Sequence, residues 1–187
     1  MSNTKKITVC AMMIALATVL AWVSNALPFK WLQGGSITLA SMVPIIVASI
    51  ITGPKWGLLS GLVYSILQIL LGGGVMTPPV QDFISYLLVV MLDYVIAFGV
   101  LGLAGLFYNM MGKKNYAMPV SALIVTFLRF VCHFLSGIII WGVYAQEGQS
   151  VMVYSLVYNG GYMVPEIIIT TVVVALLIPV INKLKAN

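Results

Sequence analysis

Four ionisable side chains lie within long apolar stretches of the sequence, namely Asp93, Arg129, His133 and Glu166. A charged group inside a bilayer costs several kcal/mol, so each of them is a candidate for a binding or transport role. The two carboxylates face one permanent positive charge, so one carboxylate lacks a partner if all of these groups point inward. A buried, unpaired carboxylate takes up a proton or binds a cation. The residues therefore predict a site for an organic cation, and the competing interpretation is a structural ion pair that locks the helices together.

Aromatic residues accompany these charges towards one end of the same stretches: Tyr94, Trp141, Tyr144, Tyr154 and Tyr158. Aromatic faces attract cations and stack on flat heterocycles. Tyr144 and Tyr158 fit an aromatic belt at the membrane interface better than a pocket. Trp141 follows His133 by two helical turns, and Gly137 between them leaves room for a ligand against the helix backbone.

The composition requires the lipid bilayer as the main solvent of the chain. It has 187 residues, of which 61% are hydrophobic and 7% charged, and a mean hydropathy of +1.11. A soluble domain carries about 25% charged residues. A spanning helix needs about 20 apolar residues, so six spans with short loops use nearly the whole chain. We expect one transmembrane domain over residues 1–187, with no room for a soluble catalytic or nucleotide-binding domain.

Proline, glycine and lysine turns divide the sequence into six predicted helices of an all-α bundle. We expect them at about 7–27, 37–52, 56–71, 81–111, 118–143 and 157–181. The first apolar run is long and its small residues are spread along a helix, so we interpret it as a span and not as a cleaved signal peptide.

Lysines are distributed unequally between the two sides of this predicted bundle. One side carries only Lys30, whereas the other carries Lys5, Lys6, Lys55, Lys113, Lys114, Lys183 and Lys185. Positively charged loops stay in the cytoplasm. The sequence therefore predicts cytoplasmic termini in a multi-pass protein of the cell membrane, with the loops around Trp31, Gly73 and Glu147 facing outward.

The predicted spans bring the charged groups to one depth. With a rise of about 1.5 Å per residue, Asp93 and His133 lie about 15 Å and Glu166 about 14 Å below the outer surface. Arg129 lies one turn deeper than His133 on the same helix face. Asn159, at the start of the last predicted helix, is placed to bond to a ring nitrogen of a ligand.

Other chemistries have no motif in their favour. The sequence contains no Walker loop, catalytic triad or zinc-ligand spacing, and His133 is its only histidine. Cys10 and Cys132 fall within apolar segments and form neither a metal motif nor a disulfide framework. We therefore expect no enzymatic activity, no bound metal and no cofactor.

Several stretches resemble a known family of transport proteins. Residues 92–98 (LDYVIAF) and 102–107 (GLAGLF) resemble helix 4 of the thiamine-specific S-components of energy-coupling factor (ECF) transporters. Residues 129–137 (RFVCHFLSG) and 141–145 (WGVYA) resemble the family's helix 5 and the loop after it, and 154–160 (YSLVYNG) resembles its entry to helix 6. The likeness covers most of the chain and is weakest in the first three predicted helices.

The resemblance implies a high-affinity thiamine pocket that opens to the outside. The positions that correspond to the family's site are Asp93, Tyr94, His133, Gly137, Trp141, Tyr154 and Asn159. It further implies that Asp93 holds the thiazolium and that the aminopyrimidine stacks near Trp141 and bonds to His133 or Asn159, while the loops after the first and fifth predicted helices close over the ligand.

The sequence departs from the family pattern at several positions. The family has glutamate where this chain has Asp93, a helix 3 tryptophan near Tyr64, and a loop 1 tryptophan near Gly35 for which Trp31 is the substitute. Glu166 is outside the family pattern and is included in the predicted site on its depth and charge alone.

The resemblance also implies partner proteins. An S-component docks on a membrane scaffold subunit that two cytoplasmic ATPase subunits drive, so ATP is used only by the partners. Small residues on the first helix form that docking surface, which corresponds here to Ala11, Ala15 and Ala17. Spacing alone is equally compatible with packing inside the chain, because small residues let any two helices approach closely.

Three alternatives stay open at this point. The first is an S-component for riboflavin or a hydroxymethylpyrimidine precursor, in which Asp93 and Arg129 form a structural pair. The second is an intramembrane enzyme that uses Asp93 and His133 as acid and base. The third is a stand-alone ion-coupled carrier, which usually has more helices and an internal repeat.

Overall fold

The computed structural model describes residues 1–24 and 35–186, in which the secondary structure is helical. The predicted outer-loop residues Lys30 and Trp31 lie outside the described residues. The helices are α1 (Asn3–Ser24), α2 (Val43–Thr52), α3 (Pro54–Leu71), α4 (Phe83–Val89), η1 (Val90–Val95), α5 (Ile96–Gly99), η2 (Val100–Leu103), α6 (Ala104–Met110), α7 (Ala117–Ile139), η3 (Gly142–Tyr144), α8 (Val151–Leu176) and α9 (Ile178–Ala186).

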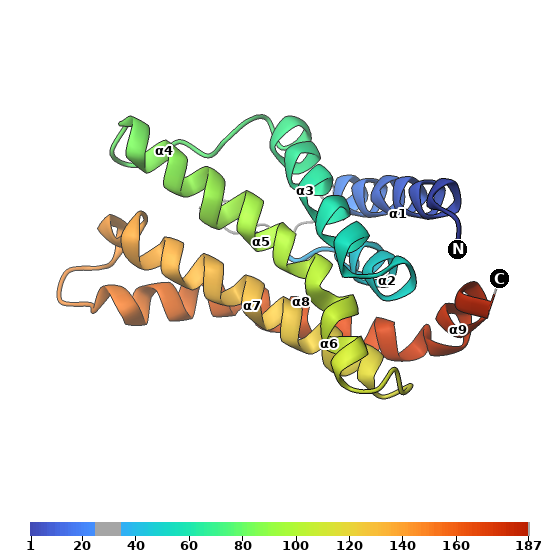
Figure 1. Cartoon of the computed structure of the whole chain (residues 1–187). Helices are drawn as coiled ribbons and strands as arrows, with labels where there is room; N and C mark the ends of the chain where they lie inside the picture. The colour runs from blue at the N-terminus through green and yellow to red at the C-terminus, as the bar shows by residue number, and fades with distance from the viewer. Residues whose placement is uncertain (25–34, 187) are drawn as a thin grey trace.

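The arrangement confirms the predicted all-α membrane bundle. Five described helical stretches are long and apolar enough to cross a membrane, with α4 to α6 forming one of them, and α2 is a shorter apolar helix. The two termini lie at one end of the bundle, and the α7–α8 connection lies at the other (Figure 1). This is the arrangement that an even number of crossings produces, and the cytoplasmic location of the termini stays a prediction.

The second predicted helix is shorter than expected. It begins at Val43 and not near residue 37, because the preceding segment makes tertiary hydrogen bonds in place of helical ones. The backbone N–H of Leu39 donates to Ser24 Oγ at 2.7 Å, and Ala40 adopts a left-handed φ of 58°. At 1.5 Å per residue α2 is only about 15 Å long, half of the hydrocarbon core.

The connection between the fifth and sixth predicted helices also differs from expectation. Helix α7 ends at Ile139, and α8 begins at Val151, six residues before the predicted start at 157. Tyr154 and Asn159 therefore lie inside a regular helix and not at its entry. The helix continues through Pro165 to Leu176.

The fourth span changes its helical type twice. Residues Val90–Val95 form a π-helical turn that contains Asp93, and Val100–Leu103 form a 3-10 turn. Turns of the π type occur mostly as single insertions at functional sites, because the extra residue re-aims the side chains around it. The span begins at Asp82, whose carboxylate accepts a hydrogen bond from the backbone N–H of Ser85 at 2.6 Å.

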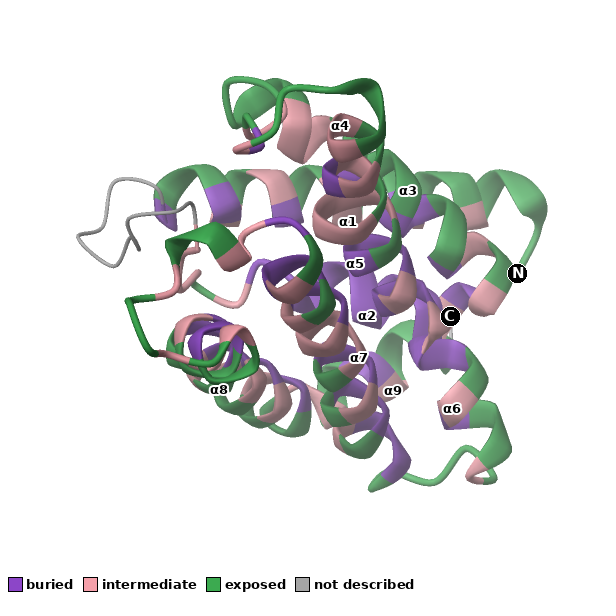
Figure 2. Ribbon diagram, turned by 90° about the vertical axis from the view of Figure 1, so that its left-hand side faces the viewer, coloured by how far each residue is buried: buried purple, intermediate pink, exposed green. Residues whose placement is uncertain are grey.

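Small residues let α2, α3 and the fourth span pack at backbone contact. A Cβ at Gly61 would lie 2.6 Å from the carbonyl oxygen of Phe98, and a Cβ at Gly102 would meet the backbone of Gly57. Ser49 of α2 donates to the carbonyl oxygen of Gly102 and accepts from the N–H of Gly105 at 2.8 Å. Helix α2 is buried at the centre of this packing (Figure 2).

Many large apolar side chains face outward from the bundle. Met12, Trp22 and Phe83 are exposed by 66%, 68% and 81%. A soluble protein rarely exposes so much contiguous apolar surface. These faces suit lipid, whereas the polar groups described next are turned inward.

Candidate binding site

A cavity of about 790 Å³ opens between α3, the fourth span, α7 and α8, in the half of the bundle that lies towards the α7–α8 connection. Ligand pockets usually measure about 300–1,000 Å³. Of the residues predicted for the site, seven line this cavity: Asp93, Tyr94, His133, Gly137, Trp141, Tyr154 and Asn159. The cavity brings together residues from separate helices, but Glu166, which the depth argument places at the same level, is not in its described lining.

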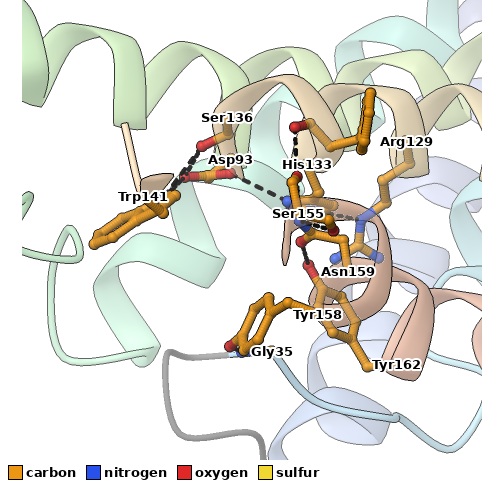
Figure 3. A network of polar contacts seen from close by, with 11 residues as sticks. Gly35, Asp93, Arg129, His133, Ser136, Trp141, Ser155, Tyr158, Asn159 and Tyr162 are labelled. Carbon is orange, nitrogen blue, oxygen red and sulfur yellow. Dashed lines mark hydrogen bonds and ion pairs between the residues drawn. The ribbon is translucent and has the colours of Figure 1, made fainter. Parts of the chain in front are cut away.

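Asp93 accepts hydrogen bonds from three described side chains, all on α7 or just after it (Figure 3). One oxygen lies 3.2 Å from His133 Nδ1. The other accepts from the Ser136 hydroxyl at 2.7 Å and from the Trp141 indole N–H at 3.1 Å. The α7 segment thus surrounds the carboxylate of the fourth span with neutral donors, which stabilise its negative charge.

Arg129 is separated from Asp93 by His133. The guanidinium Nε donates to His133 Nε2 at 3.2 Å, so the imidazole is neutral and its Nδ1–H points to Asp93. Arg129 also donates to Met42 Sδ at 2.8 Å, and its Cζ lies 4.3 Å from the centre of the Phe98 ring. Within residues 1–24 and 35–186 no carboxylate lies within 4.0 Å of this guanidinium, so a direct Asp93–Arg129 ion pair is not formed there.

Aromatic rings of α8 form the opposite wall. The rings of Tyr154 and Tyr158 stack with centres 6.0 Å apart, and Tyr158 meets Tyr162 edge-on. Tyr162 also packs edge-on against the imidazole of His133, with centres 6.0 Å apart. Tyr158, which the sequence assigns to an interfacial belt, lines the cavity, whereas the exposed Tyr144 does not belong to its described lining.

Asn159 and Gly137 join α8 to α7 beneath this wall. The Asn159 amide accepts from the Tyr162 hydroxyl at 2.7 Å and donates to the Ser155 carbonyl at 3.0 Å. A Cβ at Gly137 would lie 2.8 Å from Asn159 Nδ2 and would also meet the Ser155 side chain. The missing side chain at Gly137 therefore serves the close approach of the two helices, and not only free space for a ligand.

Two predicted site residues lie behind the cavity wall. Tyr64 is fully buried, donates to the carbonyl oxygen of Ala17 at 3.4 Å and packs edge-on against Phe98. Glu166 is also buried and accepts a hydrogen bond from the backbone N–H of Thr38. Neither belongs to the described lining, so neither is in a position to touch a ligand in this conformation.

The three predicted docking residues differ in exposure. Ala11 and Ala15 lie on the exposed face of α1, as a contact surface requires. Ala17 is fully buried against the core, so its side chain is out of reach of a partner and serves packing inside the chain.

Several residues of the site are missing from the sequence prediction. Ser136 follows His133 by three positions, and Tyr162 follows Asn159 by three, so helical spacing alone places each on the face of a predicted residue. Met42 and the 72–77 loop carry no comparable signal, because their approach to the site depends on the fold.

Comparison with known proteins identifies the family. Residues 7–186 match the family described as "Thiamine transporter protein (Thia_YuaJ)". The chain belongs to this thiamine transporter family. One relative in the family is thiamine transporter ThiT of Bacillus subtilis strain 168, which is 35% identical over 176 residues, 89% of this chain and 86% of the relative. Another is thiamine transporter ThiT of Lacticaseibacillus paracasei, which is 33% identical over 156 residues, 76% of this chain and 73% of the relative.

A solved structure of ThiT from Listeria monocytogenes has the same fold. It superposes with a TM-score of 0.75 at 22% identity and covers 98% of both chains. The predicted resemblance, the helical membrane fold and the multi-pass membrane location are thereby confirmed. Thiamine transporters are a family of transport proteins, so the intramembrane-enzyme alternative gains no support.

Proposed function

We propose that this chain captures thiamine from outside in the cavity around Asp93, as the membrane-embedded binding subunit of an ECF-type transporter. One observation carries the proposal: a carboxylate at the cavity wall is held by uncharged donors and has no direct cationic partner among the described residues. Asp93 and Arg129 both line the cavity, but the neutral His133 stands between them. A bound cation would supply the direct partner that Asp93 lacks.

Thiamine matches this environment in charge and shape. Its thiazolium carries a permanent positive charge, and both of its rings are flat. The cation is attracted by Asp93 and by the faces of Trp141 and Tyr154, because aromatic faces are negative. An uncharged ligand such as riboflavin would leave the negative charge of Asp93 without a cation to pair with.

His133 and Asn159 act on thiamine through other residues in this proposal. Both nitrogens of His133 are engaged, one with Asp93 and one with Arg129, and both ends of the Asn159 amide have partners on α8. His133 therefore orients Asp93, and Asn159 orients Tyr162. This differs from the direct bonds to the pyrimidine that the sequence suggests.

The partners follow from the proposed transporter class. A scaffold subunit in the membrane docks on the exposed face of α1 that contains Ala11 and Ala15, and two cytoplasmic ATPase subunits supply the energy. Met12, Leu16 and Val19 widen this face with exposed apolar surface. The chain itself binds thiamine without a cofactor.

Thiamine titration of the purified protein in detergent, followed by tryptophan fluorescence, tests the assignment. Asp93→Asn keeps an oxygen acceptor for Ser136 and Trp141, but removes the charge and replaces the acceptor of His133 Nδ1–H by an amide NH₂. We expect affinity to fall at least about tenfold, which corresponds to about 1.4 kcal/mol. Asp82→Asn is the matched control, since it makes the same chemical change at an exposed position outside the cavity.

Each other outcome contradicts a stated part of the proposal. Equal affinity of Asp93→Asn and the wild type contradicts the cation site. Binding of riboflavin or a hydroxymethylpyrimidine, without thiamine binding, keeps the transporter class and overturns the ligand.

A further inference from the structure

Glu166 is a buried carboxylate that the proposed thiamine site does not use directly. Only 1% of the residue is exposed, and it lies outside the described cavity lining. Burying a carboxylate in a membrane protein is costly, so such a group usually serves function. It follows Pro165, whose ring cannot donate the helical hydrogen bond to the carbonyl of Gly161. The costly side chain thus lies on a locally weakened turn of α8.

The contact of Glu166 is with a segment of irregular backbone. Its Oε1 accepts a hydrogen bond from the backbone N–H of Thr38. That N–H has no helical acceptor, because α2 begins only at Val43. Thr38 is half-buried, and the carboxylate of Glu166 satisfies a backbone donor that the local fold leaves open.

Two further side chains hold the same segment from either side. The N–H of Leu39 donates to Ser24 Oγ of α1 at 2.7 Å, and the N–H of Gly35 donates to the Tyr158 hydroxyl of α8 at 3.3 Å. Residues 35–41 are therefore attached to α1 and α8 by side-chain acceptors. We call this stretch the wall segment, because Gly35, Ser36, Thr38 and Ser41 all line the cavity.

We propose that Glu166 is a positioning residue that fixes the wall segment through Thr38 and thereby retains the bound thiamine. This inference rests on the proposed function. In this inference the hydrogen bond from Thr38 to Glu166, and not the negative charge of Glu166, holds the wall segment in place. Among the described residues Glu166 Oε2 has no hydrogen-bond partner, so glutamine at this position loses no bond that the structure contains.

The test compares Glu166→Gln with Glu166→Ala. Glutamine keeps an oxygen acceptor for the Thr38 N–H, whereas alanine removes it. We expect thiamine to dissociate about tenfold faster from Glu166→Ala and within about threefold of the wild-type rate from Glu166→Gln. Thr170→Val is the matched control, because Thr170 is a fully buried residue one turn further along α8 whose hydroxyl has no partner among the described residues.

A second readout needs no ligand and separates positioning from general destabilisation. Ser36→Cys introduces a thiol into the wall segment, while the native Cys10 and Cys132 are buried. In the ligand-free protein we expect a thiol reagent to label Ser36→Cys faster when it is combined with Glu166→Ala than with Glu166→Gln. Thr170→Val should leave the labelling rate unchanged.

The outcomes distinguish this inference from the proposed function. Equal effects of Glu166→Gln and Glu166→Ala on dissociation would overturn it in favour of a charge effect, and unchanged dissociation and labelling in Glu166→Ala would overturn it outright. If wild-type protein binds no thiamine, the proposed function fails, yet the labelling comparison still decides whether Glu166 positions the wall segment.

Discussion

The two halves of the bundle are held together in different ways. We call the half that contains the termini the inner half and the half that contains the α7–α8 connection the outer half. In the inner half α2, α3 and the fourth span meet through Gly57, Gly102 and Gly105 at backbone contact, and Ser49 bonds directly to main-chain atoms. In the outer half α7 and α8 approach closely at Gly137, whereas side-chain hydrogen bonds to Asp93 join the fourth span to α7 beside a cavity of about 790 Å³.

This difference indicates that the inner half mainly stabilises the fold, whereas the outer half mainly forms the binding site. Backbone contact allows no adjustment, because the touching atoms have no rotamers to change. Side chains such as His133 and Ser136 of α7 reach the fourth span and hold Asp93 with a defined geometry. The tight inner half fixes the helices, and the outer half is thereby free to keep a ligand-sized space open.

Gly102→Val should therefore have the largest effect on stability. Its Cβ would meet the backbone of Gly57 and Leu58, which cannot move aside, so we expect a loss of about 3 kcal/mol or more in the free energy of unfolding. Thermal unfolding in detergent measures this loss. Gly160→Ala is the control, because a Cβ there meets no atom within 4 Å. A Gly102→Val protein that melts like the wild type would show that the inner half is not packed at backbone contact.

Trp141→Phe should have an intermediate effect, confined to the outer half. Phenylalanine keeps an aromatic face but removes the N–H that donates to Asp93 and Ser136, so the carboxylate is held less firmly in its position towards the ligand. We expect thiamine affinity to fall about three- to tenfold, as for the loss of one hydrogen bond, with little change in melting temperature.

Calorimetric titration suits this variant better than fluorescence, because the change removes a tryptophan. Trp56→Phe is the control, since Trp56 lies at the start of α3 and outside the described cavity lining. An affinity loss as large as that of Asp93→Asn would mean that the indole itself, and not its bond to Asp93, dominates binding.

For the outer half, the sequence predicts which residues belong to the site better than it predicts which residues they contact. Asp93, His133 and Trp141 are found from charge, depth and helical spacing, because the position of a residue in a regular helix fixes the face on which its side chain lies. The partner of Glu166 is not found, because this bond depends on the wall segment, which has no periodic pattern.

For the inner half, the sequence predicts the bounds of the helices but not the contacts between them. Its helices are predicted within a few residues from apolar runs and glycine or proline turns, apart from the late start of α2. The contact of Gly57 with Gly102 is not predicted, because the sequence does not reveal which faces of two apolar helices meet. The π turn at Asp93 is likewise not predicted, because the apolar run from which this span is predicted does not distinguish a π turn from an α-helical one.

Asp82→Ala should have the smallest effect, because Asp82 lies at the exposed outer start of α4 and in neither packed half. Hydrogen bonds from Ser85, through its backbone N–H and its hydroxyl, lower the pKa of the Asp82 carboxyl. A lowered folded-state pKa stabilises the protein above the unfolded value of about 4, and this contribution is lost as the pH falls through the folded value. We therefore expect Asp82→Ala to melt slightly below the wild type at pH 7 and the difference in melting temperature to close below about pH 4.

Melting curves of both proteins across this range measure the difference, with Glu147→Ala as a control that removes an exposed carboxylate from a loop. A gap that stays constant with pH would assign the effect to helix propensity and not to the charge of Asp82 at the cap.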